Sequence, residues 1–414
     1  MDGLQNVYSG GTTTGTTIKN GGAQIVDSGG TAKNTTIAAG GGLIVQEGGK
    51  ATGVEQQDGA ALIATTSADT VVSGKNELGA FSIENGQAKN VLLENGGQLT
   101  VVDGTSATGT TLREGGYQYV ESGGTATDTI IENGGIQAVY FRGTADSTTI
   151  NNGGTQNVGG TATGTIIGMG GLQTVNFGDT AEGTTIKQGG TLNVKDGGQA
   201  TDVEQQEGAA LIATTGTGTV VSGKNSVGDF SIENGQADKV LLENGGQLTV
   251  VSNTSATNTT IRDSGMQTVK SGGTATGTII ENGGLLNVHD GGKAEDTIIE
   301  NGGLMKNAGG EDSGTTVKNG GVYEFWGIDD STSIDMARAS DLTVEAGGRA
   351  TVYAGTLSGA TVKGANASLT LMTPQGNKEL FFSTLTGQVS VTEGGRLVSQ
   401  RGADMSGAEL TLSS

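Results

Sequence analysis

The chain has 414 residues, a formal net charge of −21, 78 glycines, one proline and no cysteine. The negative charge disfavours nucleic acid and anionic membranes as partners, because neither phosphate layer would attract this chain. Aromatic residues make up only 3% of the sequence, which excludes bulky globular cores but is compatible with a thin core of Val, Ile, Ala and Thr.

A repeat of about 19 residues begins near the amino terminus, and residues 1–57 hold three copies. It is clearest at residues 114–132, which read EGGYQYVESGGTATDTIIE and have near copies immediately before and after. Two Gly-Gly pairs punctuate each copy. The apolar runs between them are too short for helices and are rich in Val, Ile and Thr, which favours strands.

Three columns of the repeat stay small or apolar, and alternation with a period of two places them on one face of short strands. A strand pair this short buries its apolar face only when each turn stacks on the last. The sequence therefore predicts an all-β fold, a right-handed parallel β-helix with one repeat per coil, the hand following the general rule for parallel crossovers. The columns are Val7, Val26, Val139 and Val194; Ala32, Ala51, Ala145 and Ala181; and Ile18, Ile37, Ile150 and Ile186.

Two other features of the repeat complete this interpretation. A Gln column exchanges freely with Leu, as at Gln137 and Leu99, so we expect it inside, with stacked amides bonded to one another along the axis. The Gly-Gly pairs are expected at corners, where they supply the positive φ angles that tight bends need.

Two segments, residues 58–94 and 207–243, replace the regular pattern with nearly identical variant coils. Each carries a Phe, Phe81 or Phe230, where ordinary coils carry small residues. A Phe in a small slot costs about 1–3 kcal/mol in overpacking. We therefore expect each coil to open locally into a projecting loop or hairpin, with a change of direction as a further possibility.

Five regular repeats and one shortened by two residues (152–168) lie between the variants, and more follow to about residue 318. We divide the chain into a repeat β-helix, 1–318, and diverged carboxy-terminal coils, 319–414. The second part contains the most aromatic stretch of the chain. Its members Tyr323, Phe325 and Trp326 form a candidate ligand patch. The alternative interpretation is an apolar patch that covers a coil. A projecting turn is expected at the only proline, Pro374.

Nothing in the sequence indicates catalysis, a cofactor or a metal centre. The only histidine, His289, occupies an outward slot, and the carboxylates are scattered over different coils without a repeated partner set. The calcium-binding nonapeptide of repeat β-rolls does not occur, and Asp329-Asp330 is at most a loose ion site. We therefore predict a protein that is not an enzyme.

The outward positions flanking the Ala column indicate a polar strip. Thr is also a good strand former on a solvated face, and this property alone would account for many of the Thr residues. As a function, a flat row of donors and acceptors can meet an identical row on a second copy. The candidate self-association face consists of Thr31, Lys33, Asn34, Thr125, Thr127, Asp128, Thr144, Asp146, Thr161, Thr163, Thr180 and Glu182.

The motif Gly-Gly-x-Gln-x-Val-x-x-Gly-Gly-Thr-Ala-x-x-Thr-x-Ile resembles the passenger repeats of AIDA-type and antigen 43-type autotransporter adhesins. The variant coil that includes Phe81 looks especially like the antigen 43 group. The resemblance implies the surface of a Gram-negative bacterium, with export through the outer membrane. Because the family carries a signal peptide and a barrel that this sequence lacks, we expect the chain to be part of a longer protein.

The resemblance also implies partners. The first is the chain itself on neighbouring cells, giving autoaggregation and biofilm formation. The alternative is a host-cell receptor or glycan, bound through the 323–326 patch or the Pro374 turn. A heptosyltransferase that modifies Ser or Thr is a further partner implied by the family, whereas nucleic acid is excluded by charge.

Overall fold

The computed structural model describes residues 3–329, 334–372 and 383–413, and the predicted turn at Pro374 and the carboxylate of Asp330 lie outside them. Every regular element in the described residues is a β-strand. The chain comprises two compact units, Met1–Gln206 and Glu207–Ser414. This division differs from the predicted boundary near residue 318, which stays a prediction.

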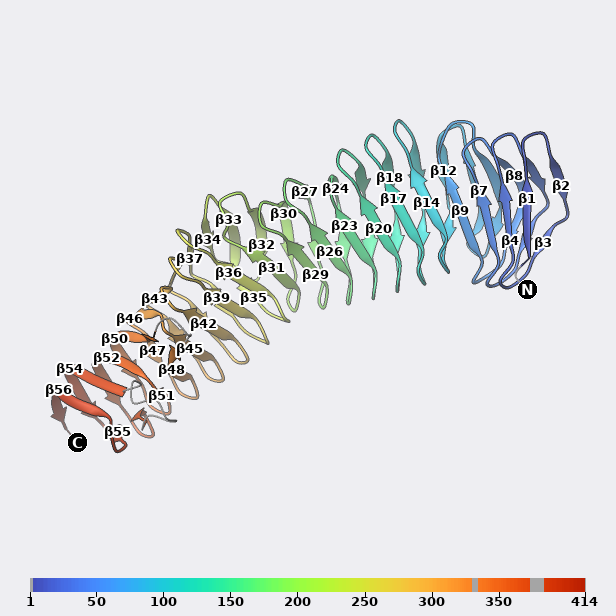
Figure 1. Ribbon diagram of the computed structural model, residues 1–414. Coiled ribbons are helices and arrows are strands. Elements are labelled where there is room, and N and C mark those ends of the chain that lie inside the picture. The colour runs from blue at the N-terminus through green and yellow to red at the C-terminus, as the bar shows by residue number, and fades with distance from the viewer. Residues whose placement is uncertain (1–2, 330–333, 373–382, 414) are drawn as a thin grey trace. The chain divides into compact units, whose positions relative to one another are not determined.

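In the first unit, each regular coil contributes three short strands, and equivalent strands of successive coils pair in parallel (Figure 1). We call the three resulting stacks the first, second and third sheets, although long strands such as β8 join the second to the third. The first sheet contains β1 (Leu4–Val7), β4 (Ala23–Val26), β7 (Gly42–Val45), β9 (Ala61–Thr65), β14 (Gln98–Val101), β17 (Tyr117–Val120), β20 (Ile136–Val139), β23 (Thr155–Val158), β26 (Leu172–Val175) and β29 (Thr191–Val194). The second contains β2 (Thr12–Thr14), β5 (Thr31–Lys33), β8 (Lys50–Gln56), β10 (Val71–Asn76), β11 (Gly79–Glu84), β12 (Gln87–Lys89), β15 (Ser106–Thr108), β18 (Thr125–Thr127), β21 (Thr144–Asp146), β24 (Thr161–Thr163), β27 (Thr180–Glu182) and β30 (Gln199–Gln205). The third contains β3 (Thr17–Ile18), β6 (Thr36–Ile37), β13 (Leu92–Leu93), β16 (Thr111–Leu112), β19 (Ile130–Ile131), β22 (Thr149–Ile150), β25 (Ile166–Ile167) and β28 (Thr185–Ile186).

The second unit repeats this plan. Its first sheet contains β31 (Ala210–Thr214), β36 (Gln247–Val250), β39 (Met266–Val269), β42 (Leu285–His289), β45 (Leu304–Ala308), β48 (Val322–Asp329), β51 (Arg349–Val352), β53 (Ser368–Leu371) and β55 (Arg396–Ser399). The second contains β32 (Val220–Asn225), β33 (Gly228–Glu233), β34 (Gln236–Asp238), β37 (Ser255–Thr257), β40 (Thr274–Thr276), β43 (Lys293–Glu295) and β46 (Glu311–Ser313), and the third contains β35 (Leu241–Leu242), β38 (Thr260–Ile261), β41 (Ile279–Ile280), β44 (Ile298–Ile299) and β47 (Thr316–Val317).

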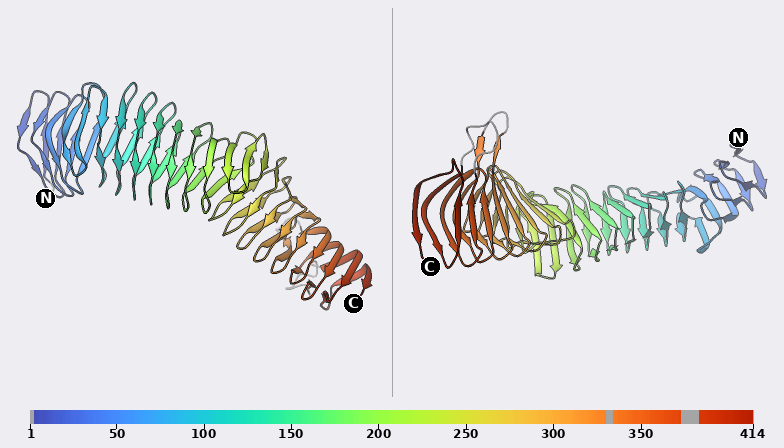
Figure 2. Two further views of the ribbon diagram at one scale, coloured as in Figure 1. Left: turned by 180° about the vertical axis from the view of Figure 1, so that it is seen from behind. Right: turned by 90° about the horizontal axis from the view of Figure 1, so that it is seen from below.

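Towards the carboxy terminus the second and third strands of a coil merge into one long strand, in β50 (Arg338–Val344), β52 (Gly355–Lys363), β54 (Ser383–Thr392) and β56 (Asp404–Leu412). A separate antiparallel pair joins β48 to β49 (Ile334–Met336). The right-hand view of Figure 2 shows the described part of this hairpin standing away from the coils.

The register of the strands confirms the predicted parallel β-helix with coils of about 19 residues. Val120 pairs with Val139, Ala126 with Ala145, and Ile131 with Ile150, all in parallel strands. Each of these side chains is buried. The core is therefore a thin column of Val, Ala and Ile that runs through the stack of coils, as the alternation predicted.

The buried Gln ladder is also confirmed. Gln137 Nε2 donates to Gln118 Oε1 at 2.8 Å, and Gln156 and Gln173 continue the ladder, each donating to the preceding amide at 2.7 Å. Buried threonines satisfy the remaining hydrogen-bonding groups of the amides. Gln137 Nε2, for example, also donates to Thr129 Oγ1 at 3.1 Å. Every amide donates in the same direction along the axis, so the ladder couples each coil to its predecessor.

The two glycines of a corner pair have different roles. Gly123 has φ of 77°, the left-handed conformation that side chains disfavour. Gly116, the second glycine of its pair, is not among the residues with positive φ, but a Cβ there would overlap the carbonyl of Leu93 in the preceding coil. The first glycine therefore makes the bend, and the second lets neighbouring coils approach.

Each variant coil opens into antiparallel hairpins, as predicted. β10 pairs antiparallel with β11, which pairs antiparallel with β12, and β32, β33 and β34 repeat this arrangement. Phe81 and Phe230 are buried, and each lies opposite a glycine, Gly74 or Gly223. A Cβ on Gly74 would overlap the carbonyl of Val54 in β8, so this glycine lets the hairpin lie close against the preceding coil.

Candidate functional site

The predicted self-association face lies on the outside of the second sheet in the first unit. The residues flanking buried Ala126, Ala145, Ala162 and Ala181 are partly or fully exposed. They align from coil to coil, since Thr125 pairs with Thr144, Thr144 with Thr161, and Thr161 with Thr180. We call this set, with Thr31, Lys33, Asn34, Thr127, Asp128, Asp146, Thr163 and Glu182, the Thr-Ala-Thr strip.

Three strip residues also serve the fold. Asn34 and Asp128 occupy the corner after the strand with φ of 51° and 53°, a left-handed conformation that Asn and Asp tolerate better than most residues. Asp146 Oδ1 accepts a hydrogen bond from Thr163 Oγ1 of the next coil at 2.6 Å. Substitutions at these positions therefore report on self-association only if the variant is also shown to fold.

Two buried carboxylates, which sequence reasoning missed, hold the variant coils. Glu94 is fully buried, accepts the backbone N–H of Gly59 at 2.7 Å and accepts Arg113 Nε at 2.8 Å. Arg113 also forms ion pairs with Asp58 at 2.8 Å and Glu77 at 2.6 Å. Burial lowers the pKa of Arg113, but the hydrogen bonds and charges of Glu94 and Glu77 outweigh this and raise it overall. The Arg therefore remains charged and anchors the hairpin.

The second variant coil repeats this clamp. Glu243 Oε1 accepts the N–H of Gly208 at 2.7 Å, and its Oε2 accepts Arg262 Nε at 2.8 Å. The signal was present in the sequence, because a Glu is followed 19 residues later by an Arg in both places. The same Glu column is partly exposed in regular coils, as at Glu132, which concealed its importance.

The candidate ligand patch needs correction. Tyr323 and Phe325 are fully buried, because Tyr323 occupies the Gln column and Phe325 the Val column of the first sheet. Their rings stack on each other at 4.1 Å inside the coil. Only Trp326 is at the surface, 41% exposed, where it stacks on Tyr353 at 4.1 Å and donates to Glu324 at 3.3 Å.

A buried polar group accompanies these rings. Asp312 occupies the Ala column and accepts hydrogen bonds from Thr315 Oγ1 at 2.8 Å and from the Tyr323 hydroxyl at 2.9 Å. Burial raises the pKa of Asp312 to about 7, although these hydrogen bonds oppose the shift. Burial and the Asp312 charge raise the pKa of Tyr323 as well. Asp312, Thr315 and Tyr323 thus form a buried polar cluster.

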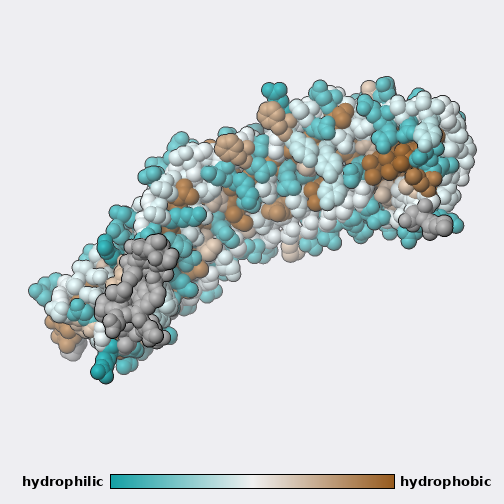
Figure 3. Space-filling model, in the orientation of Figure 1, coloured by the Kyte–Doolittle hydropathy of each residue, from teal (hydrophilic) through white to brown (hydrophobic). Residues whose placement is uncertain are grey.

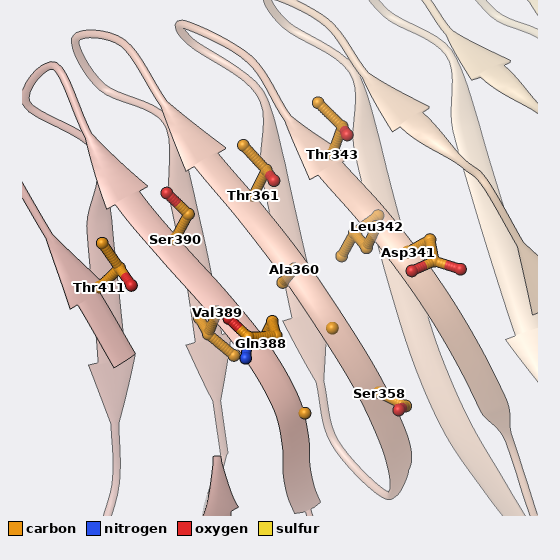
Figure 4. A pocket seen from close by; sticks show the side chains of 12 residues that line it. Asp341, Leu342, Thr343, Ser358, Ala360, Thr361, Gln388, Val389, Ser390 and Thr411 are labelled. Atoms are coloured by element: carbon orange, nitrogen blue, oxygen red, sulfur yellow. The ribbon is translucent and has the colours of Figure 1, made fainter. Parts of the chain in front are cut away.

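The merged strands of the second unit line an open groove of about 450 Å³ (Figure 4). One wall carries Thr343, Thr361, Ser390 and Thr411 in register, and the other carries Ser358. Asp341 and Gln388 are the long polar side chains at its rim (Figure 4). The groove offers hydroxyl groups but no arrangement of acid, base and nucleophile.

The remaining surface is predominantly polar. The face shown in Figure 3 is mainly hydrophilic, with a hydrophobic patch over the amino-terminal coils and smaller hydrophobic spots elsewhere. His289 is exposed, as predicted. The described residues contain no cluster of three or more His, Cys, Asp or Glu side chains that could hold a metal ion. In the same residues, no helix has the length and apolar character needed to cross a bilayer.

Coils stacked by parallel pairing of equivalent strands define this chain as a β-solenoid. A family model described as "Adhesin of bacterial autotransporter system, probable stalk" matches residues 3–60, 73–135, 122–171, 222–284 and 275–321, together more than half of the chain. The chain belongs to this AIDA family of autotransporter adhesins.

Individual relatives agree with this assignment. The chain is 39% identical over 361 residues to "Probable autotransporter YpjA" of Escherichia coli strain K12, covering 87% of the chain but only 20% of YpjA. It is 56% identical over 45 residues, 11% of the chain and 5% of the relative, to the "Autotransporter adhesin/invasin TibA" of Escherichia coli O78:H11. The chain thus spans a fifth or less of the length of these relatives.

A solved structure is also similar, a TibA fragment hyper-glycosylated in a reaction catalysed by TibC. It is 31% identical, with coverage of 79% of this chain and 98% of that chain, and its TM-score is 0.41.

Proposed function

We propose that this chain is the self-associating part of a cell-surface adhesin, exported through the outer membrane of a Gram-negative bacterium. Its role is structural and not enzymatic, and its partner is the same chain on a neighbouring cell. Contact between such chains brings cells together in aggregates and biofilms. Membership of the autotransporter adhesin family supports the location and the adhesive role.

One observation carries the proposal: the Thr-Ala-Thr strip repeats a partly exposed Thr in register over successive coils, and beyond the Ala column it presents Thr, Asp or Glu. Each hydrogen bond across such a contact contributes only about 0.5–1.5 kcal/mol net, so strength must come from number. A two-fold contact uses each pair twice, because residue i meets j and j meets i. Many copies on two cells then add avidity.

The direct test is the oligomeric state of the purified chain by sedimentation at micromolar concentrations. We expect a concentration-dependent dimer at physiological salt, where the repulsion between two acidic chains is screened. A chain that stays monomeric across this concentration range contradicts the proposal.

A second candidate role is binding of a host receptor or glycan, and one observation favours it. Trp326 is exposed beside Tyr353 and forms a small aromatic surface in a chain with few exposed aromatic residues. Aromatic faces of this kind suit apolar or sugar-ring contacts. Trp326→Ala should abolish binding to host cells and leave settling of displaying cells intact, with Trp326→Phe as the control. Unchanged host-cell binding by Trp326→Ala removes this role.

Modification by a heptosyltransferase is a further part of the proposal. Its support is the row of partly exposed Thr residues and the similarity to TibA, a fragment of which is hyper-glycosylated. Intact mass of the chain from a host that has the transferase is the measurement. A mass equal to that of the bare chain contradicts this part.

A further inference from the structure

The shortened coil at residues 152–168 interrupts the corner between the first and second sheets. In regular coils four residues separate the last Val of the first sheet from the first Thr of the second, as between Val139 and Thr144. The shortened coil has only Gly159 and Gly160 between Val158 and Thr161. A Cβ on Gly160 would overlap the carbonyl of Tyr140, so the coil is drawn tightly against its neighbour at this point.

The interruption breaks a ladder of backbone hydrogen bonds. At this corner the N–H of Gly104 donates to Gly123 O at 3.1 Å, that of Gly123 to Arg142 O at 3.0 Å, and that of Gly178 to Gly197 O at 3.0 Å. The shortened coil has no residue at this level. Within the described structure, the N–H of Arg142 and the carbonyl of Gly178 consequently have no protein partner.

Exposed aromatic residues lie on both sides of the break. Phe141 is 68% exposed in the preceding coil, and Phe177 is 80% exposed in the following coil. They occupy the same column, two positions after Val139 and Val175. Coils stack about 4.8 Å apart, so the two corners lie about 10 Å apart along the axis with the shortened coil midway between them.

Two opposite charges also lie on either side of the shortened coil. Arg142 follows Phe141, and Asp179 lies two residues after Phe177. Neither forms an ion pair within the described residues, and the Arg142 guanidinium lies 5.0 Å from the centre of the Phe141 ring. Burial without a cation raises the pKa of the Asp179 carboxyl. Arg142 and the partly buried Asp179 therefore lie on opposite sides of one coil, each without an ion pair in the described residues.

We infer that the shortened coil is the two-fold centre of an antiparallel contact between two copies of this chain, in which Phe141 packs on Phe177 of the second copy and Arg142 pairs with Asp179 of the second copy. The two-fold operation exchanges the preceding coil of one copy with the following coil of the other, so both contacts form twice. The corner also adjoins the Thr-Ala-Thr strip at Thr144, Thr161 and Thr180. This inference rests on the proposed self-association and assigns its register.

The chain has no cysteine, so single introduced cysteines report contacts directly. A mixture of Phe141→Cys and Phe177→Cys chains should form disulfide-linked dimers on mild oxidation. Each variant alone should not, because its own counterpart lies farther away than the roughly 4.4–6.8 Å between Cα atoms that a disulfide spans. Tyr8→Cys, which replaces another exposed aromatic residue, is the control for random collision. Equal cross-linking in the mixture and in the single variants overturns the inference.

Charge exchange provides a second, independent measurement. Arg142→Asp and Asp179→Arg should each weaken the dimer about tenfold, as loss of a central contact does, and the double variant should restore it. Melting temperatures check that each variant folds. If these variants and Phe141→Ala leave the dimer unchanged while charge reversal in the Thr-Ala-Thr strip abolishes it, the register is wrong and the proposed function stands. A chain that never dimerises contradicts both.

Discussion

Asp312 should make the second unit less stable as pH rises through neutrality. Burial raises its pKa from 3.8 to about 7. Because the pKa is higher in the folded state, the protonated Asp312 carboxyl contributes its full stabilisation below pH 3.8. This stabilisation is lost as the pH rises through about 7. Three pH units at about 1.36 kcal/mol each correspond to about 4 kcal/mol of unfolding free energy.

The substitution Asp312→Asn removes the titration. Its carbonyl oxygen can accept from Thr315, and its NH2 group then faces the Tyr323 hydroxyl, which can accept a hydrogen bond from it. We therefore expect the wild-type chain to lose stability relative to this variant between pH 4 and pH 8, by up to about 4 kcal/mol. The only tryptophan, Trp326, lies in the same strand as Tyr323, so its fluorescence reports urea unfolding of this region. Asp341→Asn, at an exposed corner, is the matched control. Parallel stability curves for wild type and Asp312→Asn over this pH range refute the reasoning.

Two other substitutions test how the first unit is held together. Arg113→Met should lower the unfolding free energy by about 3–5 kcal/mol, because it leaves the buried carboxylate of Glu94 without its cation. The control Lys187→Met, at an exposed site, should change it little. Faster hydrogen exchange confined to β10–β12 checks this prediction, and unchanged exchange contradicts it. Gln137→Leu should cost about 1–3 kcal/mol, because Thr148 and Gln156 lose a buried acceptor while the side chain still fits a column that holds Leu elsewhere. Gln137→Glu should cost more, because it buries a charge, and denaturant unfolding that ranks the two in the opposite order contradicts the ladder argument.

The repeat columns predicted most of the fold because each coil meets a copy of itself. Val120, Ala126 and Ile131 can be buried only by their equivalents in neighbouring coils, so the period determines both the register and the core. The size of Phe81 likewise predicted that the coil opens, and β10 and β11 pair as an antiparallel hairpin. The repeat pattern therefore predicts how the side chains pack as well as where the strands lie.

The errors arose where a residue departs from its column. Tyr323 and Phe325 are members of a coil, and their alignment after Gly320-Gly321 places them at the Gln and Val positions. Their aromatic character suggested a surface patch, but the polar cluster of Asp312 and Thr315 accommodates the Tyr323 hydroxyl inside. The Glu94–Arg113 clamp was missed for the converse reason, because an acidic residue in an outward column gives no sign that a hairpin buries it.

The central claim is that the Thr-Ala-Thr strip holds two chains together, and cell settling tests it most directly. Cells that display the protein with Lys33→Glu, Asp128→Lys, Asp146→Lys and Glu182→Lys combined should no longer settle. The control combines Lys187→Glu with Glu84→Lys, Glu114→Lys and Glu132→Lys, which changes the net charge equally but away from the strip, and these cells should settle like wild type. Normal settling of the strip variant, with the folded protein shown to be present at the cell surface, contradicts the account.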